Sequence, residues 1–436
     1  MTVKRRSLSA PGDRELRLWR VGRALALSFC VAVLVAGCVF FGLVYLLGFQ
    51  EIDNTQKLDA KTLFDLVKLS FGVVAGAGAL VALVVAYRRQ RVDEAGAHRE
   101  ATRLHTDRFS QAVDKLGSDS PAVRLGGVHA LAGLADDAPD DDLRQTCIDV
   151  LCAYLRLPFS PDPGDLSDLA EGTSEEQRDA HQEKRNRYRA LREVRHTILR
   201  LIGDHYRIPA GTHRSWQGCN LDLTGVTIDV GMSFRGASFS CGHVRFTGAR
   251  FSGDYVRFDG ADFCGATVSF AGAEFSGANV HFDRAAFSGG SVYFDKTVFS
   301  GGSVVFDRAV FSGGYVFFLD AVFSGGAVRF SLATFSGGVV DFVGAVFSGG
   351  EVRFFAANFS NGEVSFDHTV FSGGEVSFDH AEFLGGGVRF VNARFFGGHV
   401  RFDATTGPVP GGLLQAVGTP TPAEIRLRSD WLSATA

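Results

Sequence analysis

A unit of twelve residues recurs through the second half of the chain and constrains its fold more than any other feature. The stretch FDRAVFSGGYVF, residues 306–317, is one copy, and fourteen copies run without a break from Phe234 to Arg401. Numbered from Phe234 as position 1, every copy has Phe at positions 1 and 6, Val at position 11, and Ala or Thr at position 4. Self-similarity at a short fixed period is the signature of a repeat architecture.

The spacing of the invariant residues predicts strands. Val at position 11 and Phe at the next position 1 are two apart, as are Ala and Phe at positions 4 and 6, so each pair shares one face of a strand. No 3.6-residue period is present, which excludes a helix. Gly-Gly at positions 8 and 9 separates the pairs, where the chain must turn and where we expect a positive φ.

Two units are needed to enclose a core. One unit has two inward pairs and therefore two sides, whereas 24 residues have four sides and close a rectangular coil. Residues 234–402 then make about seven coils with 29 inward Phe rings. The high counts of Gly (53) and Phe (40) in the chain belong to this repeat rather than to a disordered segment.

Charge and cysteine content exclude few classes of function. The net charge of −4 on 436 residues gives no overall indication of a nucleic acid or an acidic partner. The seven Cys residues show no CxxC spacing, so we interpret them as reduced thiols in an intracellular protein.

Two apolar segments near the N-terminus predict a membrane hairpin. Residues 21–49 and 63–87 are each long enough to cross a bilayer core, which takes about 20 residues, and 50–62 would be a short external loop. Gly72 and Gly76 stand four apart, which suits close helix packing or is simply tolerated in lipid. Lys and Arg precede the first segment and follow the second, so both termini and the repeat are expected in the cytoplasm, with the chain multi-pass in the inner (plasma) membrane.

An exported protein is the rival interpretation. The residues Val35-Ala36-Gly37-Cys38 resemble a lipoprotein cleavage site behind a basic start of residues 1–20, and a plain signal peptide is a related alternative. The apolar run continues to Phe49, however, and a second apolar segment follows, which favours the hairpin.

The middle of the chain reads as helical. Residues 88–160 contain VRLGGVHAL, which resembles one HEAT-type helical repeat and must pack on another part of the chain. An acidic linker, 161–183, leads to a basic amphipathic helix at 184–210, which either caps the repeat array or lies on anionic lipid. Residues 406–436 leave the repeat at Gly407-Pro408 and form either a C-terminal cap or a disordered tail.

Small–polar–large triplets relate the array to a known family. Ala261-Asp262-Phe263 and Cys219-Asn220-Leu221 fit the unit of pentapeptide-repeat proteins, although here every second unit carries two extra residues. With the apolar segments and the block AVRLGGVHAL, the chain resembles membrane-anchored pentapeptide-repeat proteins of actinobacterial type. The resemblance implies a mainly β fold, a right-handed quadrilateral β-helix over 215–405, preceded by two transmembrane helices and a small α-helical region.

The outward positions suggest a scaffold with an unknown protein partner or a homo-oligomeric interface. Outward apolar residues stack at 24-residue intervals and form the candidate interface, unless they merely suit stacked strands: Val298, Val322, Val346, Val370, Tyr293 and Phe317.

The alternative function is a DNA mimic that binds DNA gyrase, as some pentapeptide-repeat proteins do. Residues 234–402 hold 15 acidic against 12 basic side chains, a weak imbalance for a mimic, although Asp259, Asp283 and Asp307 share one column. We expect no nucleic acid as a partner.

The sequence predicts no enzyme. His368 and His380 are twelve residues apart and fall on opposite sides of one coil, so we expect no metal site there. The Gly-Gly pairs lack the Lys and the strand–helix context of a phosphate loop. We therefore predict no catalytic residue, no cofactor and no small-molecule substrate.

Overall fold

A computed structural model describes residues 60–159, 162–165, 174–253 and 255–433, with scattered residues between 27 and 45. The chain divides into two compact units, Met1–Ala101 and Thr102–Ala436. The predicted basic tail and most of the predicted segment 21–49 lie outside the described residues. Within the described part of the chain, no helix combines the length and the apolar character needed to cross a membrane, so the two predicted spans are unsupported.

The predicted segment 63–87 belongs to a longer helix. Helix α2 (Ala60–Leu116) continues through residue 87 without a break. Polar pairs one turn apart favour this continuation: Arg89 and Asp93 form an ion pair at 4.0 Å, and Gln90 donates to Glu94 at 2.9 Å.

Three further helices precede the repeat in the second unit: α3 (Pro121–Asp136), α4 (Asp141–Arg156) and α5 (Glu175–Tyr206). Each begins at a residue suited to a helix start, for α3 Pro121 at the first turn and for α5 a capping box between Ser174 and Gln177. A Cβ on Gly127 would lie 2.6 Å from the backbone nitrogen of Leu116, so the second glycine of VRLGGVHAL allows α3 to approach the end of α2.

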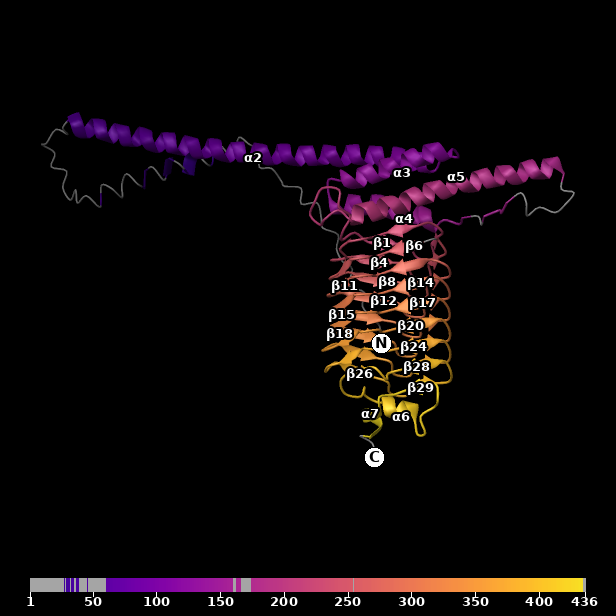
Figure 1. Cartoon of the computed structure of the whole chain (residues 1–436). Helices are drawn as coiled ribbons and strands as arrows, with labels where there is room; N and C mark the ends of the chain where they lie inside the picture. The colour runs from indigo at the N-terminus through magenta and orange to yellow at the C-terminus, as the bar shows by residue number, and fades with distance from the viewer. Residues whose placement is uncertain are drawn as a thin grey trace, which may run out of the picture. The chain divides into compact units, whose positions relative to one another are not determined.

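The repeat forms three parallel sheets, seen as stacked arrows in Figure 1. The nine-stranded sheet contains β3 (Met232–Ser233), β6 (Tyr255–Arg257), β10 (Asn279–His281), β14 (Ser303–Val305), β17 (Ala327–Arg329), β20 (Glu351–Arg353), β24 (Glu375–Ser377), β28 (His399–Arg401) and β29 (Ile425–Arg426). The eight-stranded sheet contains β2 (Thr227–Ile228), β5 (Arg250–Phe251), β9 (Glu274–Phe275), β13 (Val298–Phe299), β16 (Val322–Phe323), β19 (Val346–Phe347), β23 (Val370–Phe371) and β27 (Arg394–Phe395). The twelve-stranded sheet contains β1 (Leu221–Asp222), β4 (His243–Arg245), β7 (Asp262–Phe263), β8 (Thr267–Ser269), β11 (Ala286–Phe287), β12 (Ser291–Tyr293), β15 (Val310–Phe317), β18 (Thr334–Asp341), β21 (Asn358–Phe359), β22 (Glu363–Ser365), β25 (Glu382–Phe383) and β26 (Gly387–Arg389).

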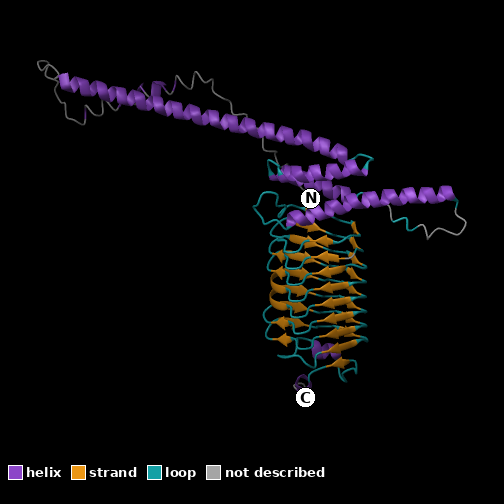
Figure 2. Ribbon diagram, turned by 45° about the horizontal axis from the view of Figure 1, so that its top comes forward, coloured by secondary structure: helices purple, strands orange, loops and turns teal. Residues whose placement is uncertain are grey.

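Strand register confirms a β-solenoid with a 24-residue coil. Phe299 pairs with Phe323 and Val280 with Val304, each 24 residues further along a parallel neighbour. One coil contributes four strands, such as β5 to β8, and β15 and β18 are long enough to cross one corner and join two sides into the twelve-stranded sheet. The nine-stranded sheet shows that the solenoid is about nine turns deep, because strands before Phe234 and after Phe402 add to the seven coils predicted for residues 234–402 (Figure 2).

Stacked phenylalanine rings fill the interior, as the inward pattern predicted. Phe306 lies 4.7 Å from Phe330 in the next coil, with the ring planes 2° apart, and it meets Phe318 edge to face at 6.0 Å. Offset stacks and edge-to-face contacts are the favoured aromatic arrangements. Where Thr297 replaces the inward Ala, its hydroxyl donates to the carbonyl of Phe270 at 2.8 Å, so the buried polar group is satisfied.

The two glycines of each turn are required for different reasons. Gly314, at position 9, has a φ of +66°, as predicted. Gly313, at position 8, needs no positive φ, but a Cβ there would lie 2.5 Å from the carbonyl oxygen of Ser288 in the preceding coil. A second left-handed residue, which was not predicted from the sequence, is position 3, where Arg284 and Arg308 have φ values of 55° and 57°.

Both ends of the solenoid are covered. At the first coil, α5 lies across the end of the solenoid, and its Tyr206 meets Phe234 at 5.8 Å (Figure 1). At the last coil, Trp431 lies 6.2 Å from Phe402. This ring belongs to α7 (Ser429–Ser433), which follows α6 (Leu413–Val417), so residues 406–433 form the cap rather than a tail.

Candidate functional site

Polar side chains gather along one corner of the solenoid, which we call the charged corner. They occupy position 12 of one strand and position 2 of the following turn, on either side of an inward Phe, so both positions face outward. The charged corner consists of Arg257, Asp259, His281, Asp283, Asp307 and Arg329.

Ion pairs and hydrogen bonds order the charged corner. Arg257 donates to both carboxylate oxygens of Asp259, at 2.9 and 3.2 Å. His281 lies with Nδ1 at 3.1 Å from a carboxylate oxygen of Asp283. A cavity of about 430 Å³ opens at this cluster, and the exposed Arg284 and Arg308 are among the residues that line it.

Arg257 stabilises the negative charge of the half-buried Asp259 at this corner. Burial pushes the pKa of Asp259 upward, but the hydrogen bonds and positive charge of Arg257 outweigh it and hold that pKa below the ordinary value. The same pairing raises the pKa of the Arg257 guanidinium. Asp259 is therefore a half-buried carboxylate whose negative charge is stabilised by Arg257.

Aromatic rings and half-buried acids gather at a second corner, which we call the aromatic corner. It consists of Tyr293, Tyr315, Phe317, Asp295 and Asp341. Phe317 stacks on Tyr293 at 5.3 Å and on Tyr315 at 5.8 Å. The predicted pair Tyr293 and Phe317 is thus brought together. Tyr315, which is 51 % exposed, was missed, although its place two residues before Phe317 on one strand could have revealed it.

Half-buried acids flank the aromatic rings without a basic partner of the kind that Asp259 has. Burial, followed by the negative charges of Asp320 and Asp341, raises the pKa of Asp295 above its ordinary value. Burial also raises the pKa of Asp341. One carboxylate oxygen of Asp295 is buried and has no hydrogen-bond partner within the described residues.

The four predicted valines form a separate stripe. They stack in consecutive coils of the eight-stranded sheet, where Val298 pairs with Val322 and Val322 with Val346. All four are only half-buried, so they do face outward. Their sheet differs from that of Tyr293 and Phe317, so the structure does not join the six predicted residues into one continuous strand surface.

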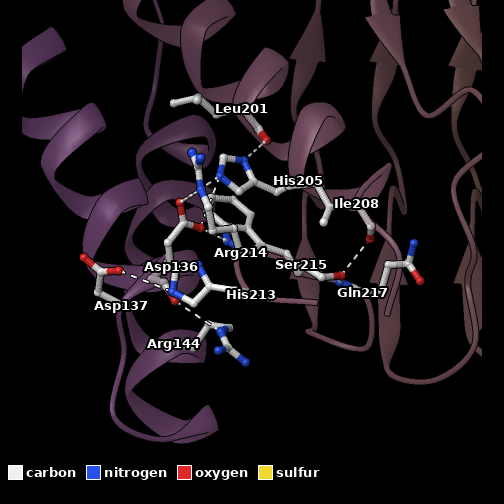
Figure 3. Close-up of polar contacts among 12 residues, drawn as sticks. Asp136, Asp137, Arg144, Leu201, His205, Ile208, His213, Arg214, Ser215 and Gln217 are labelled. Atoms are coloured by element: carbon white, nitrogen blue, oxygen red, sulfur yellow. Dashed lines mark hydrogen bonds and ion pairs between the residues drawn. The ribbon is translucent and has the colours of Figure 1, made fainter. Parts of the chain in front are cut away.

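A buried polar cluster at the first coil has the pairing of an Asp–His dyad but a structural role (Figure 3). Asp136 accepts hydrogen bonds from Arg214 at 2.9 Å and from Trp216 at 3.1 Å, and it lies 3.2 Å from Nε2 of His205. The other ring nitrogen of His205 faces the carbonyl of Leu201 at 2.6 Å. Because both ring nitrogens are occupied, this histidine fixes α3 to α5 rather than offering a base.

Comparisons with protein-family models, with curated proteins and with solved structures give no match for this chain.

Proposed function

We propose that the solenoid is a scaffold that binds another protein through its aromatic corner. The stack of exposed Tyr315 with half-buried Tyr293 and Phe317 carries this proposal. Aromatic side chains are enriched at protein interfaces because they bury a large area at little cost in conformational entropy.

The surroundings of these rings suggest the chemistry of the partner. Asp295 and Asp341 have raised pKa values because burial and neighbouring carboxylates disfavour their charged forms. A Lys or Arg side chain placed between them would relieve that repulsion, and Arg also stacks on aromatic faces. The proposed partner therefore presents a basic segment. The solenoid holds the rings at fixed spacing, so little ordering is needed on binding.

Crosslinking in cells followed by affinity capture and mass spectrometry tests the scaffold. Tyr315→Ser should abolish capture of the partner, because it removes the most exposed ring of the stack. Tyr255→Ser is the matched control, since Tyr255 also occupies position 10 and is 43 % exposed, but it lies in the nine-stranded sheet.

The outcomes separate the alternatives. Loss of a partner only in Tyr315→Ser supports the aromatic corner, whereas loss in Val322→Asp with Val346→Asp would move the interface to the valine stripe. Self-crosslinks alone would identify a homo-oligomer. Recovery of DNA gyrase would instead favour the DNA mimic, and equal capture by all variants would refute the proposed interface.

A tether to the inner membrane is a separate proposal that rests on the sequence of 21–49 and 63–87. The exposure of large apolar side chains on α2 supports it, since Leu69, Leu80 and Leu83 are each more than half exposed. Membrane fractionation of the full chain, with carbonate and detergent extraction, is the test. Release of the chain by carbonate would refute a spanning anchor, and protease sensitivity of the repeat only in opened cells would place it in the cytoplasm.

A further inference from the structure

We propose that Asp259, His281 and Asp283 form a site for a divalent transition metal ion such as Zn²⁺ at the charged corner. Nothing in the scaffold function requires this site, and it was not predicted from the sequence. Each of the three residues offers one ligand atom, and these atoms lie within 4.8 Å of one another.

The geometry needs little adjustment to hold an ion. Donor atoms bound to one zinc ion lie at most about 4.4 Å apart, which is twice a Zn–O or Zn–N distance of roughly 2.2 Å. The solenoid fixes the backbone of all three residues: Asp259 and Asp283 occupy the same position in adjacent coils, and His281 ends strand β10. Only side-chain rotation is needed to close the ligands around the ion.

The ligand set selects the type of metal. One imidazole nitrogen with two carboxylates suits zinc or a similar transition metal, whereas Mg²⁺ and Ca²⁺ prefer oxygen ligands alone. In the tautomer that carries its proton on Nε2, Nδ1 of His281 has a free lone pair, and it lies 3.1 Å from a carboxylate oxygen of Asp283, a separation that suits two ligands of one ion. Three protein ligands leave a further position open to water or to an anionic group, next to the exposed Arg284 and Arg308 of the cavity.

Arg257 opposes metal binding and supplies the most specific test. Its guanidinium donates to both oxygens of Asp259 and places a positive charge beside the site. Replacing it with a neutral side chain should therefore strengthen metal binding. A purely structural cluster of ion pairs would show no such gain.

Isothermal titration of the tag-free full chain with ZnCl₂ is the experiment. The chain has other His and Cys residues, so the comparison is between variants. We expect His281→Ala and Asp283→Asn each to lose one equivalent of zinc or to weaken its binding at least about ten-fold. Arg257→Gln should tighten binding of the same equivalent, and MgCl₂ should not displace the zinc.

A matched control keeps the test decisive. His399→Ala changes an exposed histidine on β28, outside the charged corner, so this variant should bind zinc as the parent does. Near-UV circular dichroism checks that every variant keeps the packed aromatic core. Equal zinc stoichiometry and affinity in the parent and in His281→Ala would overturn the proposal, as would displacement of the zinc by an equal concentration of Mg²⁺.

Discussion

The charged and aromatic corners share one backbone geometry and yet have opposite electrostatics. Asp259 and Asp295 both occupy position 2, directly after an inward phenylalanine. The pKa of Asp259 is lowered because Arg257 at position 12 binds it, whereas the pKa of Asp295 is raised because burial and the neighbouring acids outweigh any stabilisation of its charge. Position 12 beside Asp295 is Tyr293, which offers no positive charge.

This difference shows that the repeat supplies positions and that the neighbouring coils supply the chemistry. Each outward residue has its closest neighbours two residues away and 24 residues away. The same repeat position can therefore hold a carboxylate paired with an arginine on one side and a carboxylate whose charge is disfavoured on the other. The core beneath does not distinguish the two corners, and four predictions test the comparison.

The largest expected effect on stability comes from substitutions in the core that both corners share. Phe306 underlies the charged corner and Phe318 the aromatic corner, and each is fully buried with stacked neighbours at 4.7 Å above and below. Phe306→Ala and Phe318→Ala should each lower the free energy of unfolding by about 3–5 kcal/mol. Urea denaturation followed by circular dichroism measures both, and a difference well above 1 kcal/mol would show that the core does distinguish the corners.

Removing Arg257 should leave the acid of the charged corner without its arginine partner, so that it resembles Asp295 at the aromatic corner. Arg257→Ala leaves Asp259, whose side chain is 16 % exposed, without its partner and should cost about 1–2 kcal/mol at pH 7. Because the pKa of Asp259 is lower in the folded than in the unfolded protein, its charge stabilises the fold at any pH above the unfolded-state pKa. This contribution is lost as the pH falls through the folded-state pKa. The variant should therefore lose part of the acid dependence of stability, while Arg235→Ala, at the exposed rim of the cavity, should not.

Removing the disfavoured negative charge of Asp295 should stabilise the protein. A raised folded pKa means that the charged form of Asp295 costs stability, and this cost grows as the pH rises through the folded pKa. Asp295→Asn should raise the free energy of unfolding by about 1 kcal/mol at pH 7, with the gain vanishing near pH 3. Thermal melts across this range measure it, and Asp259→Asn, at the matched position, should be destabilising instead.

The smallest effect comes from moving the arginine to the other corner. Tyr293→Arg places a guanidinium beside Asp295 as Arg257 stands beside Asp259, and it should lower the pKa of Asp295. The accompanying change in stability should stay below about 1 kcal/mol, since the new pair is partly exposed and the stack on Phe317 is lost. An NMR titration of the Asp295 carboxyl carbon reports the shift, and an unchanged pKa would mean that burial alone sets it.

The sequence predicted the interior of the solenoid well because invariant residues mark it. Phe at positions 1 and 6 and Val at position 11 repeat often enough to reveal both the inward face and the 24-residue coil. Position 3 was missed because Arg284 and Arg308 occupy its left-handed conformation, although glycine at this position in other copies, such as Gly236 and Gly260, was a signal.

The corners were only partly predictable because their residues vary. The column of Asp259, Asp283 and Asp307 follows from the 24-residue spacing. That His281 lies close to both Asp259 and Asp283 depends on how position 12 of one coil faces position 2 of its neighbours, which requires the stacked backbone. The Asp136 cluster likewise joins residues 69 to 80 positions apart that no repeat relates.

By itself, the sequence determined a parallel β-solenoid of 24-residue coils, since a short repeat with fixed inward side chains can bury them only by stacking on itself. Tertiary structure alone decided which outward side chains meet, how the helices and the C-terminal residues cover its ends, and which acids are paired or strained. The physical reason is that burial of the inward side chains follows their regular spacing along the chain, and this spacing can be read from the sequence. Charge interactions depend on distances between side chains of different coils, and these distances cannot be read from the sequence.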